Sequence, residues 1–128
     1  GDIGCGQLAK VANQMIVGAT LNIVAEALFL AQENGADPAK VRQALAGGFA
    51  DSKILQIHGK RMVDKDYTPG GRATTQLKDL QQAQDLADKN QLNLPLNSTC
   101  LQQWQAAVDA GLGDLDQAGI LAWVEQNN

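Results

Sequence analysis

The chain has 128 residues, of which 45% are hydrophobic and 19% are charged. This length and composition predict one ordered domain with a core of its own and exclude an intrinsically disordered chain. The net charge of −4, without a cluster of basic residues, argues against a nucleic-acid-binding surface, because such surfaces take their affinity from clustered Lys and Arg.

The first third of the chain predicts one long helix, from about Gly6 to Asn34, entered through the glycine-rich turn GDIGCG. Apolar residues occupy almost every position between Met15 and Ala31, so we expect this helix to be buried on all sides as a central strut. At 1.5 Å per residue it would span roughly 40 Å. Its polar residues Lys10, Asn13 and Gln14 fall within an arc of about 100° near its N-terminal end.

The later helices are predicted from capping residues, helix breakers and apolar residues spaced by three or four. Gly35 should end the first helix. The second helix is expected over 39–46, capped by Asp37, and the third to about 66, capped by Asp51 or Ser52. The fourth should run from Thr74 or Thr75 to 89, and the fifth over 95–110, capped by Asn93. A last helix should extend to about 124, opened by Asp114 in a capping box with Gln117. No alternating run predicts a strand, so residues 1–128 should form a single all-α domain around one long central helix.

The cysteines and the hydropathy of the chain indicate where the protein is located in the cell. Cys5 and Cys100 lie in neither a CxxC motif nor a Cys/His array, and no secretory signal precedes them, so we expect free thiols in a cytoplasmic protein. The run from Met15 to Ala31 is short for a membrane span and contains Asn22 and Glu26. We therefore expect neither a membrane nor a nucleic-acid partner.

Two features that suggest a ligand site are weak. The glycines of GDIGCG follow the pattern GxxGxG with no strand before them, whereas a dinucleotide-binding turn requires GxGxxG after a strand. His58 is the only histidine and has no Cys, Asp or Glu at a metal-ligand spacing, so we expect no metal site.

Two polar groups are stronger candidates, each with a simpler alternative. Lys10 could exchange a proton with a substrate whose carbonyl or hydroxyl is held by Asn13 and Gln14, or it could be a solvated lysine at a helix end. Lys78 and Asp79, in QLKDL, would on residue type alone be the solvated surface of an amphipathic helix.

A family resemblance changes the balance for both groups. GDIGCGQLAKVANQ resembles the GxxGxGxxxKxxN segment that begins the C-terminal domain of the β-hydroxyacid dehydrogenases, which include 3-hydroxyisobutyrate dehydrogenase, tartronate semialdehyde reductase and glyoxylate/succinic semialdehyde reductases. The resemblance continues in order through EALFLAQENGADPAKVRQAL, GGFADS, YTPGGRATTQLKDL, LPL and GLGDLD, so it covers essentially the whole chain.

The resemblance implies an all-α domain, like the C-terminal domain of 6-phosphogluconate dehydrogenase-like enzymes, that follows an N-terminal Rossmann domain binding NAD or NADP. These residues contain no Rossmann domain and open within a glycine motif without a methionine, so we expect them to belong to a longer protein. The substrate would lie between the two domains. Alone, the 128 residues should neither turn over substrate nor bind the nucleotide tightly.

The resemblance also implies roles for individual residues. Lys10 matches the catalytic lysine, which donates a proton to the carbonyl oxygen during reduction and accepts it back during oxidation. Asn13 and Gln14 match substrate-binding amides. Lys78 matches a lysine that reaches the nicotinamide end of the cofactor, and Asp79 matches the acid beside it.

Substrate, assembly and a rival interpretation remain open at this point. Gly71 stands where family members often carry a Phe near the substrate, so this part of the pocket wall should differ. The pattern KxxNQ slightly favours tartronate semialdehyde reductase over 3-hydroxyisobutyrate dehydrogenase. The resemblance also implies a homodimer or homotetramer. The alternative is a stand-alone helical dimerisation or interaction module without catalysis, against which the presence of both Lys10 and Lys78 speaks.

Overall fold

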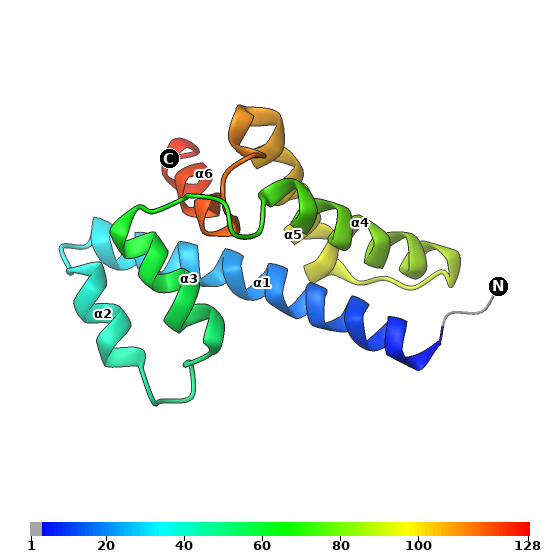
Figure 1. The fold of residues 1–128 in the computed structure, drawn as a ribbon, viewed down its shortest axis with the longest axis horizontal. Helices are drawn as coiled ribbons and strands as arrows, with labels where there is room; N and C mark the ends of the chain where they lie inside the picture. Colours follow the sequence, from blue (N-terminus) through cyan, green and yellow to red (C-terminus); the bar gives the residue numbers. More distant parts are fainter. Residues whose placement is uncertain (1–3) are drawn as a thin grey trace.

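The computed structural model describes residues 4–128, and these form an all-α domain built on α1 (Cys5–Glu33), as predicted. In Figure 1, α1 runs the length of the molecule, and the other helices pack along it. Helices α2 and α3 lie against its C-terminal half, whereas α4 and α5 lie towards its N-terminal half. The later elements are α2 (Pro38–Leu45), α3 (Lys53–Asp64), α4 (Ala73–Lys89), α5 (Pro95–Ala107), the π-helical turn η1 (Val108–Leu112), the 3₁₀ turn η2 (Gln117–Gly119) and α6 (Ile120–Gln126).

Local capping signals around α2 and α3 are confirmed. Gly35 follows α1 with φ of +92°, the left-handed conformation that glycine adopts without strain. The Asp37 side chain accepts a hydrogen bond from the backbone amide two residues on, at 3.0 Å. Ser52 is the cap of α3, since its Oγ accepts from the amide three residues on at 2.9 Å, while Asp51 instead accepts from the Gly47 amide at 2.7 Å.

The predicted start of α4 is wrong by one or two residues. The helix begins at Ala73 rather than at Thr74 or Thr75, and no side chain caps it. The reason is tertiary: the amides of Ala73 and Thr74 donate to the carbonyls of Leu115 and Gly113, at 3.0 and 3.1 Å. Backbone contacts with a distant segment therefore replace the side-chain cap.

The predicted bounds of α5 also need correction. Asn93 is not its cap; Leu94 holds that place without a side-chain hydrogen bond, directly before Pro95. The α-helix ends at Ala107 instead of residue 110, and the chain continues as η1, in which Gly111 adopts φ of +89°. The positive φ breaks the helical path and turns the chain back towards α4 and α6.

The capping box predicted at Asp114 does not form. Asp116 is the capping residue instead, because its side chain accepts from the amide of Ala118 and so opens η2 before α6. The predicted glycine-rich entry turn falls partly on residues 1–3, which lie outside the described residues; Gly4 is an extended N-cap of α1.

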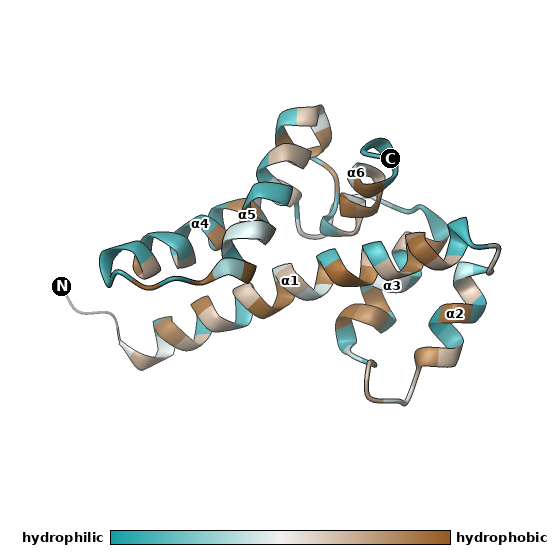
Figure 2. Ribbon diagram, turned by 180° about the vertical axis from the view of Figure 1, so that it is seen from behind, coloured by the Kyte–Doolittle hydropathy of each residue, from teal (hydrophilic) through white to brown (hydrophobic). Residues whose placement is uncertain are grey.

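The prediction that α1 is buried on all sides is wrong. Leu21 and Ala25 are fully buried, but Ile16, Ile23 and Leu30 on another face are 68, 61 and 65% exposed. We call these three residues the α1 seam, and Figure 2 shows apolar residues along the helix. Within one chain, the neighbouring helices cover only part of the circumference of α1, so its apolar content exceeds what this domain buries.

By length and composition alone α1 would be able to cross a membrane. A core helix passes the same test, and α1 contacts five other helices of the chain. It also holds the buried Asn22, whose Nδ2 donates to the carbonyl of Gly18 at 3.0 Å. These contacts are those of a core helix.

Five elements contribute large side chains to one core. The largest fully buried residues are Leu21, Met62, Leu80, Trp104, Ile120 and two polar ones, Gln76 and Asp116. Gln76 lies in the first turn of α4, and Asp116 is the N-cap of η2.

Candidate functional site

The N-terminal third of α1 presents the three residues predicted to act on substrate. Asn13 and Gln14 follow Lys10 by three and four residues, so all three lie on one side of the helix. Lys10 and Asn13 are exposed, and Gln14 is half-buried. The lysine ammonium is thus accessible from outside the domain, beside two neutral amides.

A short chain of hydrogen bonds connects this face of α1 to α4. Gln14 Nε2 donates to Asp79 Oδ2 at 2.7 Å, and Asn13 Nδ2 donates to Gln14 Oε1 at 2.9 Å. A carboxylate only accepts, so the amide nitrogen of Gln14 must face Asp79 and its oxygen must face Asn13. This order leaves Asn13 Oδ1 as an exposed acceptor.

The two residues predicted to bind the cofactor differ in their surroundings. Asp79 is half-buried against Gln14, so it is part of the α1–α4 contact. Lys78 precedes it by one residue and is exposed on α4. The structure therefore brings Asn13, Gln14 and Asp79 together, while Lys10 and Lys78 offer two solvent-accessible cations on the helices beside them.

The sequence prediction missed Gln76, which holds the backbone of the site. Gln76 is fully buried, and its Nε2 donates to the carbonyl of Gln14 at 3.1 Å. The two helices meet closely one turn further along α1, where a Cβ added to Gly18 would lie 2.7 Å from Gln76 Nε2 and about 3.1 Å from Leu80. With no side chain at Gly18, α1 and α4 approach closely while the amide of Gln76 keeps its place.

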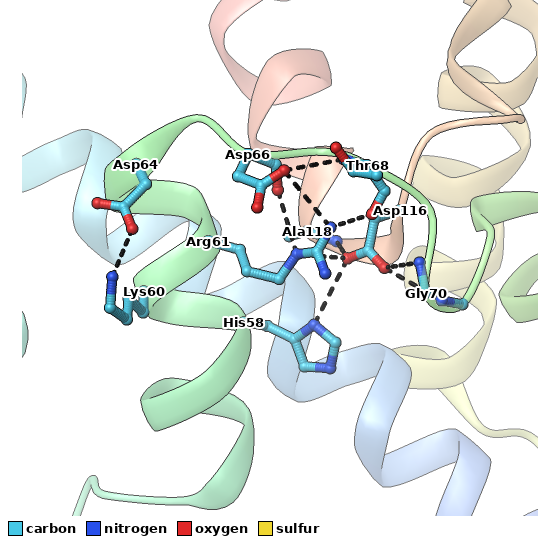
Figure 3. A network of polar contacts seen from close by, with 10 residues as sticks. His58, Lys60, Arg61, Asp64, Asp66, Thr68, Gly70, Asp116 and Ala118 are labelled. Carbon is cyan, nitrogen blue, oxygen red and sulfur yellow. Dashed lines mark hydrogen bonds and ion pairs between the residues drawn. The ribbon is translucent and has the colours of Figure 1, made fainter.

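A second polar cluster lies at the start of α4, around the buried carboxylate of Asp116, which is 1% exposed (Figure 3). Its Oδ1 accepts from the amides of Gly70 and Gly71 at 3.0 and 3.1 Å, and its Oδ2 accepts from the amide of Ala118 at 2.9 Å. One side chain therefore joins the loop before α4 to the 3₁₀ turn before α6.

Two basic side chains of α3 face the same carboxylate. Arg61 Nε lies 3.5 Å and His58 Nδ1 lies 3.7 Å from Asp116 Oδ2. Arg61 also donates to the carbonyls of Asp66 and Thr68, so it ties the beginning of the loop to the same centre. Among residues 4–128, no three His, Cys, Asp or Glu side chains are placed so that they could hold a metal ion.

The surroundings of Asp116 lower the pKa of its carboxyl group. Burial raises this pKa, but hydrogen bonds from the amides of Ala118, Gly70 and Gly71 and the charge of Arg61 outweigh burial. Because the folded-state pKa lies below the unfolded-state value, ionised Asp116 stabilises the fold above the unfolded-state pKa. This contribution is lost as the pH falls through the folded-state pKa.

The loop held by Asp116 contains Gly71, the position at which the resemblance predicts a different pocket wall. A Cβ added to Gly71 would lie 3.1 Å from Gln117 Nε2, so the side chain of Gln117 covers this glycine. The amide of Gln117 also donates to the carbonyl of Gly71 at 2.8 Å. A carboxamide therefore lies where a larger side chain at position 71 would project.

Neither Gln76 nor Asp116 was singled out by the sequence. A local signal existed for Asp116, since an Asp two residues before Ala118 suits a 3₁₀ cap. Gln76 offers only an unusual polar residue between Ala73 and Leu80 on the buried stripe of α4.

Comparison with known proteins assigns the chain to a family. The family described as NAD-binding of NADP-dependent 3-hydroxyisobutyrate dehydrogenase matches residues 4–124. The chain is 42% identical over 125 residues to 2-hydroxy-3-oxopropionate reductase of Escherichia coli, covering 98% of this chain and 43% of that protein. It is 31% identical to a probable 3-hydroxyisobutyrate dehydrogenase-like protein of Arabidopsis thaliana, covering all of this chain and 38% of that protein.

Solved structures agree with the sequence relatives. A 3-hydroxyisobutyrate dehydrogenase from Salmonella typhimurium superposes with a TM-score of 0.89 at 28% identity, covering 93% of this chain and 42% of that one. The chain thus spans about two fifths of the length of the curated relatives it matches. With a family match over nearly its whole length, the chain belongs to the NAD-binding domain family of the NADP-dependent 3-hydroxyisobutyrate dehydrogenases.

Proposed function

We propose that the chain is the C-terminal domain, residues 1–128, of an NAD- or NADP-dependent enzyme that interconverts small β-hydroxyacids and their semialdehydes. The observation that carries this proposal is the exposed Lys10 on the same face as Asn13 and Gln14, with the Gln14 amide oriented by Asp79 of α4. A lysine beside oriented amides suits a carbonyl or hydroxyl group of a small substrate.

In the proposed reaction each residue has a separate task. Lys10 donates a proton to the carbonyl oxygen as the alkoxide forms, and it takes the proton back in the reverse direction. Asn13 binds a substrate hydroxyl through its exposed Oδ1, and Gln14 holds Asn13 in the orientation that presents this oxygen. The positive charge of Lys10 also stabilises the developing negative charge on oxygen.

The described residues fit the nicotinamide end of a nucleotide better than its phosphates. Lys78 is an exposed donor on α4 and would contact a hydroxyl or amide oxygen of the cofactor, with Asp79 placing that part of the helix. When bound, the nicotinamide supplies or accepts the hydride. In nicotinamide-dependent enzymes with a Rossmann domain, the glycine-rich turn of that domain binds the pyrophosphate, so the phosphates would be held outside residues 1–128.

For the substrate we favour 2-hydroxy-3-oxopropionate, also called tartronate semialdehyde. The E. coli reductase named for this compound is 42% identical to the chain. The polar wall formed by Gln117 over Gly71 also suits a substrate with several hydroxyl and carboxyl oxygens. We also propose a cytoplasmic location, because Cys5 and Cys100 are free thiols, as is usual in a reducing compartment.

The direct test is turnover by the intact protein, expressed from the complete reading frame that contains these residues. We expect the intact protein to reduce 2-hydroxy-3-oxopropionate with NADH or NADPH. The rate is measured as the loss of absorbance of the reduced nicotinamide. A preference for 3-hydroxyisobutyrate would change the substrate but keep the reaction class. Absence of oxidoreductase activity on either compound would favour the interaction module instead.

We expect the 128-residue chain alone to bind neither NADH nor NADPH with micromolar affinity, and to be inactive. The reason is that Lys78 offers one cationic donor, whereas tight binding of a dinucleotide also needs a phosphate site. Isothermal titration calorimetry with both nucleotides measures this directly, and the intact protein is the positive control. Micromolar affinity of the 128-residue chain for either nucleotide would contradict the proposal that the phosphates are bound outside these residues.

We propose that the intact enzyme is a homodimer or homotetramer and that the α1 seam is buried between subunits. Ile23→Asp should then raise the dissociation constant of the oligomer at least tenfold, because burial of one Ile side chain stabilises a contact by roughly 1.5–3 kcal/mol. Light scattering after size-exclusion chromatography would report the change in mass. Leu92→Asp is the matched control, since Leu92 is 55% exposed but lies in the α4–α5 loop. An oligomer unaffected by Ile23→Asp would place the interface elsewhere.

A further inference from the structure

Asp116 makes more contacts than a helix cap needs. A capping carboxylate requires one or two backbone amides of its own turn, and Ala118 supplies one at 2.9 Å. Asp116 also accepts from two amides that are 45 and 46 residues earlier in the chain, those of Gly71 and Gly70. Arg61 faces the same carboxylate at 3.5 Å, so three separate segments converge on one buried side chain.

The loop that Asp116 holds is the direct start of α4. Arg72, the N-cap of α4, forms an isolated antiparallel bridge with Asp116, and the Asp116 amide donates to the carbonyl of Tyr67 at 3.0 Å. The amides of Ala73 and Thr74 continue this pairing with carbonyls of residues 115 and 113. The first turn of α4 is therefore fixed by tertiary contacts, as the missing side-chain cap of this helix already indicated.

A fixed helix start determines where the rest of the helix lies. Lys78 and Asp79 follow Ala73, the first residue of α4, by five and six residues, about 7.5 to 9 Å along the helix axis. The bond from Asp79 to Gln14 then sets the amides of α1. A shift of the Gly70–Gly71 turn is thus passed along a rigid helix to the groups that face the substrate and the cofactor.

We propose that Asp116 is a positioning residue of the hydride-transfer reaction, which holds the Gly70–Gly71 turn so that α4 presents Lys78 and Asp79 in register with Lys10. The inference rests on the proposed function, and it adds a residue distant from the reacting atoms. In this proposal the positive charge of Arg61 helps to keep the Asp116 carboxylate ionised inside the fold.

The test is Asp116→Asn in the intact enzyme. The asparagine has the same shape, but its NH₂ group must face either the Ala118 amide or the two glycine amides, all of which are donors. We expect the loop to move and kcat/KM for the hydroxyacid to fall about tenfold to a hundredfold, with a higher KM. The primary deuterium isotope effect from nicotinamide deuterated at the transferred position should rise, because hydride transfer becomes slower relative to the other steps.

A purely structural role gives a different result. If Asp116 only stabilises the fold, Asp116→Asn lowers the folded fraction and hence the apparent kcat, but KM and the isotope effect stay at their wild-type values. That outcome would overturn the inference and leave the proposed function intact. If instead the wild-type enzyme is inactive on hydroxyacids, both proposals fail together. Asp64→Asn is the control, since among residues 4–128 Asp64 pairs only with Lys60, on the exposed surface of α3.

Two further measurements keep the test decisive if Asp116→Asn does not fold. Arg61→Lys retains a positive charge near Asp116 but loses part of the guanidinium contacts with the loop, and it should raise KM and the isotope effect to a smaller degree. Wild-type values for this variant would overturn the inference. In the Arg61→Lys variant of the intact enzyme, hydrogen exchange should accelerate in peptides spanning 67–80 and stay unchanged in the second half of α4. Unchanged exchange over 67–80 would overturn the inference, independently of activity.

Discussion

Replacing Lys10 with alanine in the intact enzyme is expected to lower kcat by about 10³- to 10⁴-fold. General acid catalysis by a placed side chain contributes about 10²- to 10⁴-fold, and the lost ammonium also stabilised the alkoxide. The fold should be unaffected because Lys10 is exposed and alanine favours a helix. Steady-state turnover together with the circular dichroism spectrum measures both effects.

Two companion variants make the Lys10 experiment specific. Lys10→Arg keeps the charge but cannot release a proton near neutral pH, so it should remain strongly impaired, and this separates proton transfer from charge stabilisation. Lys53→Ala removes another exposed lysine, at the start of α3, and should leave kcat unchanged. Near-normal turnover of Lys10→Ala would remove Lys10 from the mechanism and support the interaction module.

The largest effect on stability is expected for Trp104→Ala. Trp104 is fully buried in the core cluster, between α5 and the helices around it, and removal of its indole ring leaves a cavity. Substitutions of this kind cost roughly 3–5 kcal/mol, a large part of the total unfolding free energy of about 5–15 kcal/mol for a typical domain. The melting temperature of the 128-residue chain should fall by roughly 10 to 20 °C.

Two controls separate cavity formation from loss of a hydrogen bond. Trp104 Nε1 is buried with no hydrogen-bond partner in the described part of the chain, so Trp104→Phe loses no such bond and should cost much less than alanine. Trp123 is only half-buried, and its Nε1 donates to Gln103, so Trp123→Ala should cost less than Trp104→Ala. Equal losses for Trp104→Ala and Trp123→Ala would mean that the core is not centred on Trp104.

Features that depend on adjacent residues could be predicted from the sequence. The C-terminus of α1 follows from Gly35, and the N-termini of α2 and α3 follow from the caps Asp37 and Ser52. Each of these residues acts within three residues of its own position. The all-α class follows from the spacing of apolar residues and the lack of alternating runs. The family resemblance added the roles proposed for Lys10 and Lys78, which spacing alone could not distinguish from solvated lysines.

Features that depend on distant residues could not be predicted in the same way. The start of α4 was placed at Thr74 or Thr75 because its real partners, around residues 113–116, are about 40 residues away. The Gln14–Asp79 bond spans 65 residues, so the resemblance named both residues without showing that they touch. For α1, the apolar composition indicated total burial, since a sequence does not show how much of a helix its own domain can cover.

The spacing of the α1 seam has a geometric consequence for any helix that packs against it. Ile16, Ile23 and Leu30 repeat every seven residues, and a straight α-helix with this repeat drifts only about 20° per heptad. The intervening positions Thr20 and Ala27 carry small side chains that permit a close approach. A helix from a second subunit lying along this row would therefore cross α1 at a shallow angle of about 20°, as in a left-handed coiled coil, and contact it over several turns.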